Sequence, residues 1–122
     1  MAKILVIDDT ASDAMLLVLT AKKDGHECLV ASDGKAGEQL AVANLPELIL
    51  LDIVMPGQDG FATCRRLKKN SATAHIPVIL VSSKNTEADR FWGLKQGASD
   101  YIDKPFQPST LLEAIRRHLP VA

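Results

Sequence analysis

Three short runs of consecutive large aliphatic residues constrain the fold of this chain most strongly. They are Ile4–Ile7, Leu48–Leu51 and Val78–Val81. A strand with one solvated face alternates apolar and polar residues, whereas these runs do not alternate. They are typical of strands buried on both faces, as in a parallel sheet covered by helices. Two weaker runs, Glu27–Ala31 and Tyr101–Ile102, are typical of flanking or edge strands.

The segments between these runs have helical ends that can be recognised. The first segment, Ser12–Asp24, stops at Gly25, and the second, Gly34–Asn44, can be capped by Asp33 and ends before Pro46. Asp59 can cap a third, basic helix. Thr86 and Asp89 form a shortened capping box before a fourth helix that ends at Gly97. Pro108 starts a fifth helix, which closes with Arg116, Arg117 and His118. Strand and helix thus alternate five times, which predicts an α/β fold with a parallel sheet and right-handed crossovers.

The overall composition excludes several classes of protein. The 122 residues include 14 Lys and Arg against 15 Asp and Glu, a formal net charge of −1. Nucleic-acid and membrane-surface proteins usually carry a clear basic excess, so we expect neither partner. No apolar run approaches the roughly 18–20 residues of a membrane span. Cys28 and Cys64 lack metal-ligand spacing, so we expect free thiols in the cytoplasm. We expect one domain, residues 1–122, that is monomeric and has no output domain.

Polar residues follow four of the five predicted strands at their carboxyl ends. Asp8 and Asp9 follow the first, Asp52 the third, Ser82 and Ser83 the fourth, and Lys104 with Pro105 the fifth. In an open parallel sheet, ligands bind at this edge. We therefore expect carboxylates, hydroxyls and one ammonium group to converge there. The Lys104–Pro105 bond is a candidate cis peptide, because proline weakens the trans preference.

The chemistry of this edge favours phosphoryl transfer. Carboxylates held close together repel one another and stay ionised only when a cation joins them. Oxygen ligands suit Mg²⁺, which keeps several waters and accepts phosphate oxygens as ligands. Lys104 and Ser82 can contact phosphoryl oxygens, and one carboxylate can act as the nucleophile.

These motifs together resemble the receiver domain of two-component response regulators. The residues that carry the resemblance are Val6–Asp9, Leu51–Gly60, Val81–Ser83 and Tyr101–Phe106, and it covers essentially the whole chain. It implies a flavodoxin-like, CheY-like fold with five parallel strands in the order 2-1-3-4-5 and five flanking helices.

The resemblance also implies a role for each site residue. Asp52 would accept a phosphoryl group from a phosphohistidine on a histidine kinase or phosphotransfer protein. Asp9, Asp52 and the main-chain carbonyl of Val54 would bind Mg²⁺, with Asp8 acting through a water. Lys104 would contact the acyl phosphate.

The switch residues implied by the resemblance are Ser82 and Tyr101. Ser82 would follow the phosphoryl group and Tyr101 would swing inward behind it. This movement would change the surface formed by the helix after Thr86, the strand at Tyr101–Ile102 and the helix from Pro108, where a protein target would bind. Apart from its own phosphorylation and dephosphorylation, such a protein is not an enzyme.

The fourth helical segment bears on the pathway. Phe91 and Trp92 are adjacent and point about 100° apart on a helix, so we expect one ring to reach the surface. The stretch Trp92–Ala98 resembles receivers of pilus-motility chemosensory systems. We therefore expect a role in type IV pilus or flagellar motility. A phosphorelay or phosphate-sink receiver for another kinase is the alternative.

Three other functions fit the residues less well. A phosphatase resembling the haloacid dehalogenases needs a second Asp two residues after the nucleophile, where this chain has Val54. A flavodoxin-type carrier needs a phosphate loop after the first strand, where Asp8 and Asp9 would repel phosphate. A scaffold receiver that has lost phosphorylation is disfavoured because every required residue is present.

Overall fold

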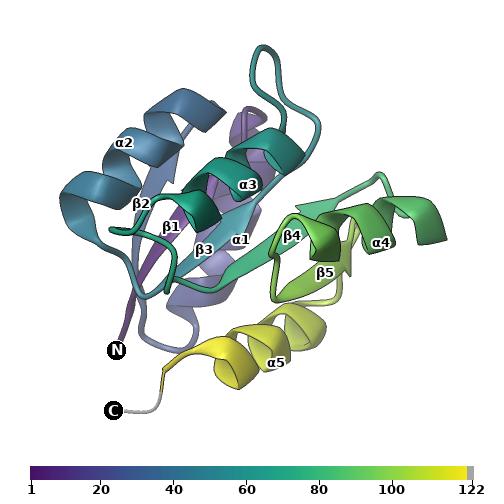
Figure 1. Ribbon diagram of the computed structural model, residues 1–122. Coiled ribbons are helices and arrows are strands. Elements are labelled where there is room, and N and C mark those ends of the chain that lie inside the picture. The colour runs from purple at the N-terminus through teal and green to yellow at the C-terminus, as the bar shows by residue number, and fades with distance from the viewer. Residues whose placement is uncertain (121–122) are drawn as a thin grey trace.

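The computed structural model describes residues 1–120 as a five-stranded parallel sheet between two layers of helices (Figure 1). The last two residues of the predicted domain range 1–122 lie outside this description. The sheet has the order β2-β1-β3-β4-β5, as expected, and the weakly apolar runs form its two edges. The strands are β1 (Lys3–Ile7), β2 (Glu27–Ala31), β3 (Leu48–Leu51), β4 (Val78–Ser82) and β5 (Asp100–Asp103).

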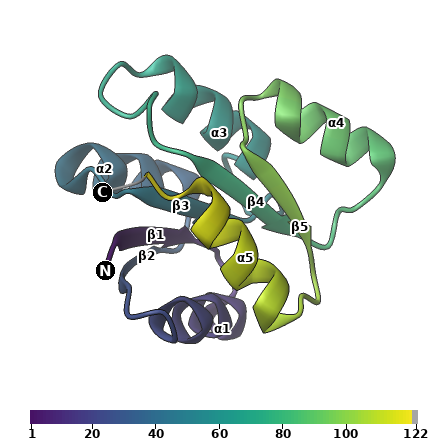
Figure 2. The same ribbon diagram turned by 90° about the horizontal axis from the view of Figure 1, so that it is seen from below.

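Helices alternate with the strands along the chain. They are α1 (Ala11–Lys22), α2 (Gly34–Asn44), α3 (Gly60–Lys69), α4 (Glu87–Lys95) and α5 (Pro108–His118). Helices α1 and α5 cover one face of the sheet, and α2, α3 and α4 cover the other (Figure 2). None of the helices within residues 1–120 has the length and apolar composition needed to cross a bilayer.

The helix caps follow the sequence closely. The side chains of Asp33 and Asp59 accept hydrogen bonds from Ala36 N and Ala62 N, at 2.7 and 2.9 Å. Thr86 and Asp89 form the reciprocal capping box. Three boundaries differ by one or two residues from the prediction: α1 begins at Ala11 after an extended Thr10 and ends at Lys22 rather than Asp24, and α4 ends at Lys95 before the left-handed Gly97.

The core consists of two apolar layers, one on each face of the sheet. Successive strand residues point to opposite faces, so Leu5 and Ile7 join the layer under α2 and α3, while Ile4 and Val6 join the layer under α1 and α5. The central runs are buried on both faces, which explains why they do not alternate with polar residues.

Strand register sets the level of the residues that leave the sheet. Ile7 pairs with Leu51 across β1 and β3, so Asp8 and Asp52 follow at the same level. The backbone fixes this arrangement, because Asp52 N donates to the carbonyl of Ile7 at 2.9 Å. On the other side of β4, Lys104 N donates to the carbonyl of Ser82 at 3.0 Å, and the Lys104–Pro105 peptide is cis. The sheet therefore delivers three carboxylates and one ammonium group to one edge.

Candidate functional site

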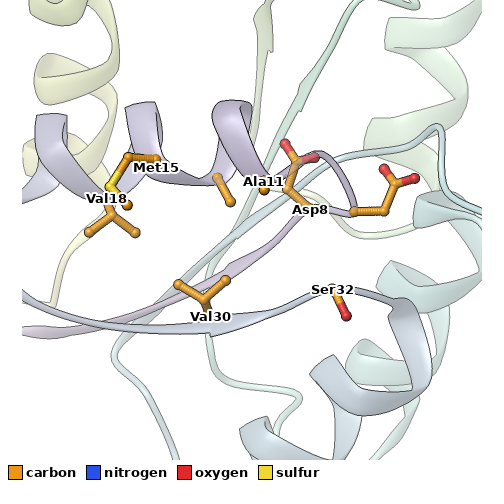
Figure 3. A pocket seen from close by; sticks show the side chains of 8 residues that line it. Asp8, Ala11, Met15, Val18, Val30 and Ser32 are labelled. Atoms are coloured by element: carbon orange, nitrogen blue, oxygen red, sulfur yellow. The ribbon is translucent and has the colours of Figure 1, made fainter.

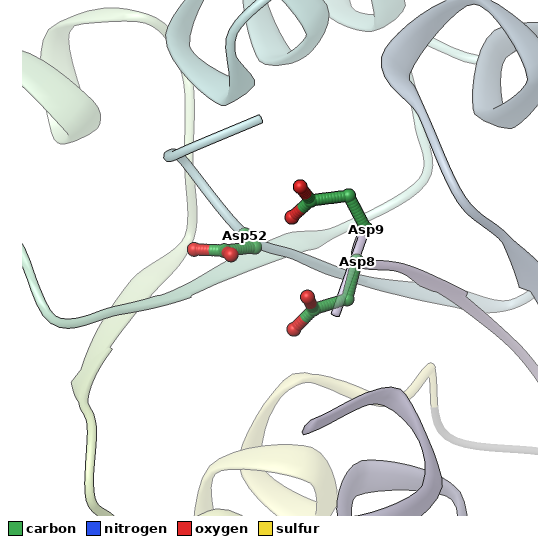
Figure 4. A group of neighbouring side chains, drawn as sticks. All are labelled: Asp8, Asp9 and Asp52. Carbon is green, nitrogen blue, oxygen red and sulfur yellow. The ribbon is translucent and has the colours of Figure 1, made fainter. Parts of the chain in front are cut away.

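Three carboxylates meet at the carboxyl end of the sheet. Asp8, Asp9 and Asp52 each offer an oxygen within 4.8 Å of the oxygens of the other two. Asp8 and Asp9 lie side by side after β1, and Asp52 faces them from the end of β3 (Figure 4). Asp8 and Asp52 are buried, whereas Asp9 is exposed. A set of hard oxygen donors with one open side is the kind of site that suits Mg²⁺.

The two oxygens of the Asp52 carboxylate have different surroundings. Its Oδ1 accepts hydrogen bonds from the backbone N–H groups of Ile53, at 2.7 Å, and Val54, at 3.4 Å. Its Oδ2 lies 3.5 Å from Lys104 Nζ. Burial raises the pKa of Asp52, the nearby charge of Asp8 raises it further, and Lys104 and the two backbone donors act in the opposite direction.

Lys104 forms ion pairs with three carboxylates at this edge, those of Asp8, Asp13 and Asp52. Its Nζ lies 2.8 Å from Asp8 Oδ2 and 2.9 Å from Asp13 Oδ2. Burial opposes the charge on Lys104, but the hydrogen bonds to Asp8 and Asp13 and the charges of Asp52 and Asp8 prevail and raise its pKa. The ammonium group therefore stays charged beside Asp52, where it can bind an anionic oxygen.

The site opens to solvent through a polar cleft of about 420 Å³. Its lining includes both Asp9 and Asp52 together with Lys104, Val54 and Ser83. A second hollow of about 290 Å³ lies between α1 and β2 and is lined mostly by apolar side chains such as Met15, Val18 and Val30 (Figure 3). The two share Asp9 at their border, but only the polar cleft reaches Asp52 and Lys104.

Helix α3 begins directly against the backbone at the end of β3. A Cβ on Gly60 would lie 2.1 Å from the carbonyl oxygen of Asp52. A side chain at this position would push the helix away from β3. Gly60 N also donates to the carbonyl of Ile53 at 2.9 Å, so the loop after Asp52 is closed by the start of α3.

The two expected switch residues lie on β4 and β5. The buried hydroxyl of Ser82 accepts a hydrogen bond from Lys84 N at 3.2 Å. The ring of Tyr101 is already inside the protein, 6% exposed, and its hydroxyl donates to the carbonyl of Lys84. Both residues therefore contact the β4–α4 loop. Burial, followed by the charge of Asp89, raises the pKa of Tyr101 to about 12.

Arg90 of α4 covers Tyr101 from outside. Its guanidinium carbon lies 5.4 Å from the centre of the Tyr101 ring, and it forms an ion pair with Asp103 at the end of β5. The neighbouring Phe91, Trp92 and Leu94 are 62%, 49% and 52% exposed. We expected one ring of the Phe91–Trp92 pair at the surface, and the structure places both there.

Sequence reasoning missed one residue of the site, Asp13. Its carboxylate reaches Lys104 from the first turn of α1, which packs beside the site. A signal was present, since Asp13 is four residues after Asp9 and stands at the start of the helix that leaves the site. Ser83 was noted only as the neighbour of Ser82, yet it lines the polar cleft with Asp52.

Comparisons with known proteins define the class. Residues 4–116 match the response regulator receiver domain. The chain belongs to this family and is a signalling receiver of two-component systems, as its motifs indicated. A structural neighbour is the Vibrio cholerae chemotaxis protein CheY4, with a TM-score of 0.91 and 28% identity over 98% of this chain and 99% of that one.

Curated relatives point to a narrower group. The chain is 44% identical to protein PilH of Pseudomonas aeruginosa over 94% of its own length and 95% of that protein. It is 41% identical to the response regulator PleD of Caulobacter vibrioides, but there the match covers 25% of the longer protein.

Proposed function

We propose that Asp52 is the phosphoryl acceptor of this receiver. The observation that carries this proposal is the position of Asp52 Oδ2, which lies 3.5 Å from Lys104 Nζ at the open side of the carboxylate cluster. The donor would be a phosphohistidine on a histidine kinase or a phosphotransfer protein. The Oδ2 lone pair attacks phosphorus, the P–N bond breaks, and its electron pair stays on the imidazole nitrogen, which then takes a proton from water.

Asp9, Asp52 and the main-chain carbonyl of Val54 would hold Mg²⁺, with Asp8 acting through a water. The donor set supports this assignment, because three carboxylates within 4.8 Å of one another repel unless a cation joins them. When bound, the ion would neutralise charge on the phosphoryl oxygens and help to align them with Asp52.

The chain itself contributes positioning and charge. The two backbone donors on Oδ1 orient the Asp52 carboxylate so that Oδ2 faces the cleft. Lys104 would contact a phosphoryl oxygen, and Ser82 would turn its hydroxyl from Lys84 N toward another. In this scheme the protein promotes its own phosphorylation and dephosphorylation and acts on no separate substrate.

The output surface would be the face formed by α4, β5 and α5. Tyr101 is already inside in this structure, so phosphorylation would stabilise that position rather than create it. A hydrogen bond from Ser82 to the phosphoryl group would release Lys84 N and rearrange the β4–α4 loop, which holds the Tyr101 hydroxyl. A protein target would then bind beside the exposed rings of Phe91 and Trp92.

Similarity to PilH supports a pathway that controls type IV pilus or flagellar motility. In this proposal the receiver acts as a monomer. The free thiols of Cys28 and Cys64 suit the reducing cytoplasm. A phosphorelay or phosphate-sink role, or a scaffold without phosphorylation, is the alternative.

Intact-mass analysis after incubation with Mg²⁺ and acetyl phosphate tests the acceptor. We expect one phosphoryl adduct that is lost with a chelator, is labile to hydroxylamine and is absent from Asp52→Ala. Asp24→Asn is the matched control, since Asp24 pairs with Arg116 away from the site and its loss should leave the adduct unchanged. An adduct that persists in Asp52→Ala would place the acceptor elsewhere, and no adduct with acetyl phosphate or a phosphorylated histidine protein would favour the scaffold.

A further inference from the structure

The ammonium group of Lys104 is shared among three carboxylates, one of which belongs to α1. Its Nζ lies 2.8 Å from Asp8, 2.9 Å from Asp13 and 3.5 Å from Asp52. An ammonium group has three N–H donors. Hydrogen bonds to Asp8 and Asp13 occupy two of them, and Asp52 is paired with the ammonium group by charge alone, at 3.5 Å. A phosphoryl group on Asp52 can therefore take more than one donor from Lys104 only if the hydrogen bond to Asp8 or to Asp13 is given up.

The three carboxylates differ in how strongly the loss of their contact with Lys104 would destabilise them. The side chain of Asp8 is 0% exposed and that of Asp52 is 8% exposed, whereas that of Asp13 is 43% exposed. A buried carboxylate left without its partner is strongly destabilising, but an exposed one is rehydrated by water. Asp13 also stands in the first turn of α1, where the helix dipole stabilises a negative charge.

We propose that Asp13 is a positioning residue that holds Lys104 until phosphorylation and then releases it to the phosphoryl group. The inference rests on the proposed function, because it needs a phosphoryl group on Asp52. Among residues 1–120, Lys104 is the only side-chain partner of the Asp13 carboxylate, so this contact can break without disturbing a second one. Asp8 keeps its contact and anchors the ammonium group throughout the exchange.

This exchange makes Asp13 a competitor of the phosphoryl group. In the unphosphorylated chain it keeps the ammonium group beside Asp52 but turns one donor away from it. In the phosphorylated chain its free charge stands on the rim of the polar cleft, which it lines together with Asp52. Both effects weaken the binding of a phosphoryl group, so removal of the charge should strengthen it.

Beryllofluoride, which adds to a carboxylate oxygen as a phosphoryl mimic, measures this competition without turnover. Its affinity is titrated by NMR at saturating Mg²⁺ for the wild type, for Asp13→Asn and for the control Asp24→Asn. We expect Asp13→Asn to bind about two- to fivefold more tightly, as expected for removal of one exposed ion pair. Asp24→Asn removes the same charge from the turn that follows α1 and should bind like the wild type.

A second readout follows the contact itself. The side-chain carboxyl carbon of Asp13 should move toward the chemical shift of a solvated aspartate when beryllofluoride binds to the wild type. Unchanged or weaker binding by Asp13→Asn, an equal gain in Asp24→Asn, or an Asp13 signal that does not move would overturn the inference while leaving Asp52 as the acceptor. A wild type that neither binds beryllofluoride nor gains a phosphoryl adduct would overturn the proposed function and this inference with it.

Discussion

Helices α3 and α4 cover the same face of the sheet but are held to it very differently. Helix α3 buries Gly60, Thr63, Cys64 and Leu67. Within α4, all of which the structure describes, the one fully buried residue is Gly93. The apolar side chains of α4 turn outward instead, and Phe91, Trp92 and Leu94 are each about half exposed or more. Packing thus fixes α3, whereas α4 covers the sheet with little buried area.

In the proposed function, this difference separates the helix that positions the site from the helix that forms part of the output surface. The N-terminus of α3 lies on the backbone of Asp52, and Lys68 near its other end donates to the carbonyls of Ala74 and Ile76. Helix α4 is joined to β5 mainly through Arg90, which contacts Tyr101 and Asp103. Elements with few buried apolar contacts open or shift at lower free energy than packed ones. Helix α3 therefore suits a fixed support, and α4 suits a surface that changes with the state of the site.

Truncation of one leucine in each helix should give the largest contrast. Leu67 of α3 is 1% exposed, so Leu67→Ala leaves a cavity and should lower the free energy of unfolding by about 2–5 kcal/mol. Leu94 of α4 is 52% exposed, and Leu94→Ala should change it by less than about 0.5 kcal/mol. Urea unfolding measures both. Equal losses would show that α4 is packed as firmly as α3.

The glycines of the two helices offer a second, smaller contrast. A Cβ at Gly60 meets the Asp52 backbone at 2.1 Å, so we expect Gly60→Ala to cost about 1–3 kcal/mol or more and to impair phosphorylation. A Cβ at Gly93 meets side chains only, Cδ1 of Leu80 at 2.7 Å and the ring carbon Cδ2 of Tyr101 at 3.1 Å, and a side chain yields more easily than the backbone.

Alanine also gains about 1 kcal/mol of helix propensity at Gly93, so Gly93→Ala should come close to neutral in stability. Because its Cβ contacts the Tyr101 ring, this variant should still change Trp92 fluorescence in the native state. A Gly60→Ala protein with wild-type stability and phosphorylation would disprove the close fit of α3 against β3.

The negative charge on Asp52 should lower the free energy of unfolding. Because burial raises its pKa, the folded chain binds the Asp52 proton more tightly than the unfolded chain does. Stability therefore falls as pH rises from the unfolded pKa through the raised folded pKa, and the cost is fully present at neutral pH. Asp52→Asn should stabilise the fold by about 1 kcal/mol at pH 7, measured in urea without Mg²⁺, and the gain should vanish in acid.

Asp24→Asn is the control, and its expected effect on stability has the opposite sign to that of Asp52→Asn. The hydrogen bonds from Arg116 lower the pKa of Asp24, so this carboxylate adds stability that is lost as pH falls through its folded pKa. The variant should therefore be slightly less stable than the wild type at neutral pH. A destabilised Asp52→Asn would mean that Lys104 more than offsets the burial of the Asp52 carboxylate.

Titration of Tyr101 tests how the α4 side is closed and should show the smallest effect on stability. It is the only tyrosine in the chain, so tyrosinate absorbance reports it alone. We expect a midpoint near 12 in the folded protein and near the ordinary value of about 10 in denaturant. Because the folded pKa is the higher one, stability should fall as pH rises through this window. A folded midpoint near 10 would place the ring in solvent.

The sequence predicts the carboxylate cluster because strand ends in a parallel sheet share an edge. Asp8, Asp9 and Asp52 needed only the strand boundaries and order to be brought together, and helix caps such as Asp59 follow from local chemistry. Asp13 could not be assigned in this way, because its contact depends on how α1 is placed relative to Lys104. The inward ring of Tyr101 is likewise a choice of rotamer that tertiary packing makes.

Backbone amide hydrogen exchange with and without beryllofluoride tests the division between α3 and α4 most directly. We expect protection to change in α4 (Glu87–Lys95) and in the loop before it, while α3 (Gly60–Lys69) stays constant beyond its first turn. The same measurement on Asp52→Asn should show no change anywhere. Equal changes in both helices of the wild type, or a response in α3 alone, would show that α3 is not the fixed support and α4 not the responsive surface.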